Sequence, residues 1–107
     1  MKLTKQTTAA LNITLEECAE VVQAISKIFR FGLDSSHPNR PGYTNKMHLE
    51  EEIGDLLCMI QLLKNQGLLD DSEVEIAMRK KLVKLQTWAP DVFEVSDKPK
   101  RRMFEKR

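Results

Sequence analysis

The sequence predicts an all-α protein, and three observations support this prediction. Apolar residues recur every three or four positions in three long segments, as on one face of a helix. Residues typical of helix ends separate these segments. No stretch alternates apolar and polar residues for long enough to indicate a strand. We therefore expect a helical bundle with antiparallel long helices.

The ends of the expected helices follow from local signals. Gly32 is expected to form a left-handed cap after the first helix, and Gly67 stops the second. The sequence SEVE, which starts at Ser72, is a capping box that would open the third helix, and Pro90 prevents its continuation. The first expected helix begins between residues 3 and 14 and ends near Phe31. The second is capped by Thr44 or Asn45 and ends at Gln66. The third opens at Ser72 and ends near Trp88.

Length and composition indicate one small domain that associates with itself. Of the 107 residues, 41% are hydrophobic and only 6% are aromatic, so the core is thin. We expect residues 1–95 to form the domain, with its core completed by dimerisation into a dimer or a tetramer. Residues 96–107 would form a basic C-terminal tail.

Charge and hydropathy restrict the partners and the location. The net charge of +1 argues against a nucleic-acid-binding surface, and the basic tail is expected to be disordered or to pack on a neighbour. No apolar run reaches the roughly 18 residues of a membrane span, and the N-terminus lacks a signal peptide. We expect a cytoplasmic protein with no membrane contact.

Cys18 and Cys58 are expected to be reduced thiols in the core.

Carboxylates interrupt an apolar face of the first two helices. Glu17 and Glu20 fall in a stripe with Ile13, Ala24 and Ile28, whereas Glu16 faces solvent. Glu52 and Asp55 fall in a stripe of the second helix with Met59 and Leu62. A further apolar stripe lies on each helix, and on the first it comprises Leu11, Leu15, Cys18, Val22, Ile25 and Phe29. Because each helix is apolar on two sides, other helices must cover both sides, and a second copy of the chain would supply them.

The four inward acids predict a site for a divalent cation. Residues three apart project to the same side of a helix, so each pair forms a two-carboxylate claw. Partly buried carboxylates repel one another unless a cation neutralises them. Hard oxygen ligands favour Mg²⁺, with Mn²⁺ possible, over zinc. The alternatives are a solvated acidic face and a di-iron centre, and the second requires a Glu-x-x-His spacing that neither claw has.

The order of the acids resembles the EExxE…ExxD signature of the all-α nucleoside triphosphate pyrophosphohydrolases, the MazG-like superfamily. The resemblance covers roughly residues 10–88 and is closest to short, stand-alone members, many of them encoded by bacteriophages. It implies Mg²⁺-dependent hydrolysis of a nucleoside or deoxynucleoside triphosphate to the monophosphate and pyrophosphate. It also implies a catalytic role for five residues, of which the last four are metal ligands: Glu16, Glu17, Glu20, Glu52 and Asp55. Glu16 would orient or deprotonate water.

Cations that bind the triphosphate are expected opposite the acids. On the third helix Lys81, Lys84 and Trp88 share a line, and Lys81 matches best the lysine that relatives carry late in this helix. Lys84 would either bind phosphate or remain a solvated surface lysine. Trp88 would be either a core or interface anchor or a platform on which the base stacks. Leu85 stands where relatives often carry Asn. Weaker candidates are Lys27 and Arg30, whose charges also suit the end of the first helix.

His48, one turn before Glu52, is expected to face a phosphate or to cap and pack. The proline-containing loop before it, with His37, Asn39, Arg40 and Tyr43, would lie over the substrate or form an ordinary surface connection.

Two rival functions fit the same sequence. One is a catalytically silent helical module that binds nucleotides or protein partners. The other is a regulatory protein that contacts nucleic acid through its basic tail, and it predicts salt-sensitive binding.

Overall fold

The computed structural model describes residues 2–93, and the tail expected at residues 96–107 lies outside this part of the chain. Regular secondary structure between residues 2 and 93 is entirely helical, as predicted. It comprises α1 (Lys5–Phe31), α2 (Asn45–Asn65), α3 (Asp71–Trp88) and the short 3₁₀ helix η1 (Pro90–Val92). The chain divides into two units, Met1–Leu69 and Asp70–Arg107, of which residues 2–69 and 70–93 are described. No helix within the described residues is long and apolar enough to cross a membrane.

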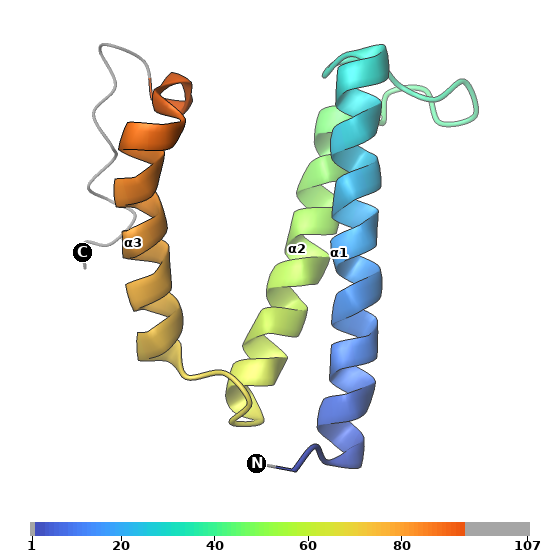
Figure 1. Ribbon diagram of the computed structural model, residues 1–107. Coiled ribbons are helices and arrows are strands. Elements are labelled where there is room, and N and C mark those ends of the chain that lie inside the picture. The colour runs from blue at the N-terminus through green and yellow to red at the C-terminus, as the bar shows by residue number, and fades with distance from the viewer. Residues whose placement is uncertain (1, 94–107) are drawn as a thin grey trace, which may run out of the picture. The chain divides into compact units, whose positions relative to one another are not determined.

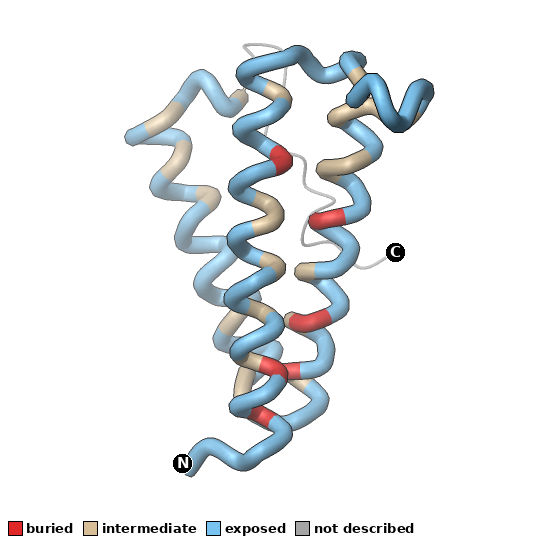
Figure 2. Tube along the Cα trace, turned by 90° about the vertical axis from the view of Figure 1, so that its right-hand side faces the viewer, coloured by how far each residue is buried: buried red, intermediate tan, exposed pale blue. Residues whose placement is uncertain are grey.

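The first unit is a pair of packed helices. The chain turns back after α1, so α2 packs along α1 (Figure 1). Buried positions lie on the facing sides of the two helices (Figure 2). The contact is made by small or flexible side chains, chiefly Ala10 and Ala24 of α1 and Met59 and Leu63 of α2. No large side chain of residues 2–93 is fully buried, so the core is as thin as its composition predicts.

Side-chain caps start both helices of the first unit. Thr4 caps α1 in a reciprocal capping box, in which Thr4 and Thr7 each accept a hydrogen bond from the backbone N–H of the other. Thr44 caps α2 by accepting from the N–H of Met47. Asn45, the other predicted cap, instead donates through Nδ2 to the carbonyl of Gly32, at 2.9 Å, and so ties the start of α2 to the end of α1.

The loop between α1 and α2 is held at both ends. Asn45 N–H donates to the carbonyl of Ser35, Lys46 N–H donates to that of Leu33, and Ser36 forms an antiparallel bridge with Thr44. Gly32 ends α1 as predicted, but its φ of 97° and ψ of 157° lie outside the left-handed helical region. The predicted left-handed cap was therefore wrong in its geometry, although the positive φ still requires glycine.

The predicted capping box of α3 was also wrong. The N-cap is Asp70, not Ser72, and its carboxylate accepts from the N–H groups of Ser72 and Glu73 and from the Ser72 hydroxyl. Because α3 already begins at Asp71, Ser72 lies within the first turn and cannot be the N-cap. These hydrogen bonds, with the Ser72 hydroxyl first, lower the pKa of Asp70. The predicted end of α3 at Trp88 is confirmed.

The two cysteines differ from the prediction of core thiols. Cys18 and Cys58 are both exposed free thiols. Cys18 belongs to the apolar stripe of α1 that does not face α2. In that stripe Leu15 is 71% exposed, Val22 67% and Phe29 85%. For Cys18 the prediction failed because α2 covers the acid-bearing side of α1 and leaves Cys18 exposed.

Candidate metal centre

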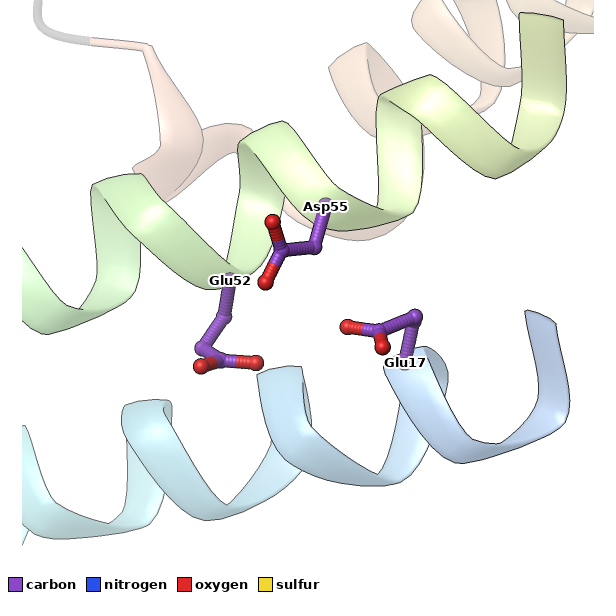
Figure 3. A group of neighbouring side chains, drawn as sticks. All are labelled: Glu17, Glu52 and Asp55. Carbon is purple, nitrogen blue, oxygen red and sulfur yellow. The ribbon is translucent and has the colours of Figure 1, made fainter. Parts of the chain in front are cut away.

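Three carboxylates from the two packed helices meet at one point of the first unit. Glu17 extends from α1, and Glu52 and Asp55 extend from α2 toward it (Figure 3). One oxygen from each lies within 4.8 Å of the others. Magnesium bound at ~2.1 Å keeps ligand oxygens up to about 4 Å apart, so small side-chain rotations suffice to hold one ion. The all-oxygen donor set therefore fits Mg²⁺ or Mn²⁺.

Packing explains why these acids converge. Residues 52 and 55 are three apart on α2, so they share one side of the helix. Glu52 is 9% exposed and lies on the face that also buries Met59. Glu17 is half-buried on the face of α1 that carries Ala10 and Ala24. Asp55, which was predicted to face inward, is exposed. The helix contact therefore brings Glu17 and Glu52 together, and Asp55 reaches the same point from an exposed position on α2.

The electrostatics of the cluster favour a bound cation. The pKa of Glu17 is raised above its ordinary value of 4.5, first by burial and then by neighbouring negative charges. In decreasing order of effect, those charges belong to Asp55, Glu52, Glu20 and Glu16. Each effect opposes ionisation, and a divalent cation would remove the repulsion.

The remaining predicted acids lie nearby but outside the group of three. Glu20 is half-buried one turn beyond Glu17, and its charge reaches Glu17. Glu16 is exposed, as its position on the helix predicts. The charges of Glu16 and Glu20 both raise the pKa of Glu17. The oxygens close enough to share an ion are those of Glu17, Glu52 and Asp55.

A cavity of about 470 Å³ adjoins this cluster. It is formed by the end of α1, the following loop and the first turns of α2. His48 connects the cavity to the acids, because it lines the cavity and its Nε2 lies 3.5 Å from Glu52 Oε1. Lys27 also lines it. Arg30 is not part of the lining, and its guanidinium lies over the Phe31 ring, 4.9 Å from the ring centroid.

Sequence reasoning overlooked Glu51. This glutamate lines the cavity and accepts a hydrogen bond of 2.9 Å from the hydroxyl of Tyr43. The guanidinium of Arg40 lies 3.6 Å from the centroid of the same Tyr43 ring. Glu51 follows His48 by three residues, so helical spacing alone was a signal that both line one surface.

The predicted substrate-binding residues of the third helix belong to the second unit. Lys81, Lys84 and Trp88 are exposed on α3, and Trp88 is 81% exposed. Because α3 belongs to a different unit from the acids, their role as substrate ligands stays a prediction.

Comparison with known proteins agrees with the helical acidic site. Residues 5–93 match the MazG nucleotide pyrophosphohydrolase domain. The chain belongs to the MazG nucleotide pyrophosphohydrolase family. The match includes all three described long helices and the acids of this MazG domain. Searches of curated proteins and of solved structures found no significant match.

Magnesium is expected to stabilise this MazG domain measurably. Adding Mg²⁺ to the metal-free protein should raise the melting temperature, by about 10 °C at roughly one hundred times the dissociation constant. Glu17→Gln should raise the melting temperature without metal, because it removes one of the repelling charges, and should reduce the Mg²⁺-dependent increase. Thermal unfolding with and without Mg²⁺ measures both effects.

Comparing the metal-free wild type with Glu17→Gln shows how ionisation of Glu17 changes stability with pH. Since the folded-state pKa of Glu17 is raised, its ionisation disfavours folding above that pKa, and protonation relieves this effect as pH falls toward 4.5. Metal-free wild type should therefore gain stability relative to Glu17→Gln on acidification through this window. A constant difference between the two proteins would contradict the raised pKa.

Proposed function

We propose that this protein is a Mg²⁺-dependent nucleoside triphosphate pyrophosphohydrolase that cleaves the bond between the α- and β-phosphates. The observation that carries the proposal is the convergence of Glu17, Glu52 and Asp55 within the family-matched span. The substrate is a ribo- or deoxynucleoside triphosphate, and the products are the monophosphate and pyrophosphate. We expect the enzyme to act in the cytoplasm, where nucleotides and magnesium are available.

The chain's own residues would bind the ion, position the substrate and direct water. Glu17, Glu52 and Asp55 would hold the ion, with Glu20 completing the set from one turn along α1. Mg²⁺, when bound there, neutralises phosphate oxygens and stabilises negative charge on the pyrophosphate leaving group. His48 and Lys27, which line the adjoining cavity, would contact the substrate beside the acids.

Hydrolysis needs one water and one proton acceptor. A carboxylate at the edge of the cluster, which we assign to Glu16, would accept a hydrogen bond from the water and orient it toward the α-phosphorus. The water oxygen forms a bond to phosphorus as the bond to the bridging oxygen breaks. The water proton passes to the carboxylate, and the electron pair leaves with pyrophosphate. No covalent nucleophile is required.

A second copy of the chain would complete the bundle. The exposed stripe of α1, which includes Leu15, Val22 and Phe29, presents a row of apolar side chains that water solvates poorly. We propose that this stripe packs against a partner chain in a dimer or a dimer of dimers of antiparallel helices. This arrangement would cover the side of α1 that α2 leaves open.

Pyrophosphate release from a panel of nucleoside and deoxynucleoside triphosphates tests the proposed reaction. We expect Mg²⁺-dependent release from at least one member, with the monophosphate as co-product and with loss of activity when a chelator is added. Release of inorganic phosphate in place of pyrophosphate would show that a different bond is cleaved. Absence of hydrolysis across the panel would favour the silent binding module.

A further inference from the structure

The cavity beside the acidic cluster is placed to receive the nucleoside part of the substrate. This step rests on the proposed function, in which the phosphates lie at Glu17, Glu52 and Asp55. His48 belongs to both regions, so a nucleotide bound at the acids can extend directly into the cavity. A volume of about 470 Å³ lies within the range of small-molecule sites.

The lining of the cavity suits a base better than a phosphate. Phe31 and Tyr43 supply aromatic surface, and the ring of Tyr43 is fixed by Arg40, whose guanidinium stacks on it. Glu51 places a carboxylate in the same lining, where it would repel a phosphate group. Lys27 of α1 and Arg40 are the cations of the lining, and with Arg40 stacked on Tyr43 we assign Lys27 to the phosphate side.

Glu51 is oriented by Tyr43 and keeps hydrogen-bonding capacity for a ligand. The Tyr43 hydroxyl donates to Oε2 of Glu51 at 2.9 Å. Burial, followed by this hydrogen bond, raises the pKa of Tyr43 above its ordinary value. The tyrosine hydroxyl is protonated at neutral pH and can donate. Within residues 2–93, Oε1 of Glu51 makes no hydrogen bond or ion pair. A carboxylate only accepts hydrogen bonds, so the open oxygen favours an amine over a carbonyl at the position of the base that faces it.

We propose that Glu51 is a specificity-determining residue that selects bases carrying an exocyclic amine, as cytosine and adenine do. The amine donates to the open carboxylate oxygen. In uracil and hypoxanthine a carbonyl oxygen replaces this amine and faces the carboxylate, which is unfavourable because both groups are acceptors. Tyr43 acts as a positioning residue that holds the carboxylate in place.

Matched nucleotide pairs test the selection. The wild-type enzyme should show kcat/KM values about 10- to 100-fold higher for dCTP than for dUTP, and likewise for dATP than for dITP. Glu51→Gln should bring both ratios close to one, because an amide accepts from an amine and also donates to a carbonyl. Each ratio compares two nucleotides with the same variant. A general loss of activity caused by the change next to Glu52 therefore lowers both kcat/KM values and leaves their ratio unchanged.

Two further variants separate selection from structural effects. Tyr43→Phe keeps the aromatic ring but removes the hydroxyl that orients Glu51, so it should reduce the preference without abolishing activity. Glu50→Gln is the matched control, because Glu50 is exposed and pairs with Lys46 at 3.1 Å outside the cavity lining. Its ratios should equal those of the wild type. Unchanged ratios in Glu51→Gln would overturn the inference while leaving the pyrophosphohydrolase intact.

Binding of monophosphates tests the base site without hydrolysis. Calorimetric titration with dCMP and dUMP should show tighter binding of dCMP to wild type and nearly equal binding to Glu51→Gln. Equal affinities in the wild type would overturn the inference. If no triphosphate is hydrolysed but dCMP is preferred through Glu51, the proposed function fails and the base selection stands.

Discussion

Replacing Glu52 with glutamine is expected to lower the rate of pyrophosphate release by about 1000-fold. Glu52 is the most buried acid of the cluster, at 9% exposure. One of its carboxylate oxygens lies within 4.8 Å of an oxygen of Glu17 and of Asp55. Glutamine has nearly the same shape, but it lacks the charge that binds a divalent cation. The rate should be measured at saturating Mg²⁺ and substrate with a pyrophosphate assay.

Stability measurements distinguish loss of chemistry from loss of fold. Glu52→Gln removes one charge from a repelling group, so the metal-free variant should melt at or above the wild-type temperature. Glu50→Gln, on the exposed face of the same helix, should retain wild-type activity. If Glu52→Gln retained more than about a tenth of wild-type activity, Glu52 would not belong to the metal site.

Charged substitutions in the exposed apolar stripe of α1 are expected to separate the oligomer into monomers. Val22 and Phe29 are 67% and 85% exposed in the single chain, so a partner that covers them would bury most of both side chains. Losing this burial in the double variant Val22→Glu/Phe29→Glu should weaken association by about 1000-fold. Sedimentation at a series of concentrations measures the dissociation constant.

The control for this variant is a charge elsewhere on the surface. Gln61 is exposed on α2 and bonds to Asn65 of the same helix, so Gln61→Glu should leave association unchanged. A double variant that sediments like the wild type would show that the partner does not cover this stripe. A monomeric wild type would remove the proposed assembly.

Local signals predicted much of the helical framework. Thr44, Gly67 and Pro90 indicate helix boundaries because caps and breakers act within a few residues. The failure at α3 has the same local origin, since Asp70 and Ser72 both qualify as caps and only the folded backbone shows which one accepts the N–H groups. The reciprocal box of Thr4 and Thr7 escaped prediction because it uses Thr where Glu or Gln is usual.

The candidate site was predictable only in part. The spacing of Glu52 and Asp55 assigns both to one side of a helix, because 3.6 residues per turn is an intrinsic property of the backbone. Spacing within one helix does not decide which residue of another helix lies opposite. The structure brings Glu17 to this pair and leaves Glu20 one turn away. The cavity depends on a loop folded by long-range hydrogen bonds, such as that from Asn45 to Gly32, which no periodic pattern encodes.

The sequence by itself determined the all-α class, the positions of the helices and the presence of carboxylates in apolar faces, because each of these follows from contacts within a few residues. Only the tertiary structure decided which apolar stripe of α1 is buried, which three acids meet, and that Glu51 lines a cavity beside them. These features depend on the rotation and register of one helix against another, and packing between residues distant in sequence sets both.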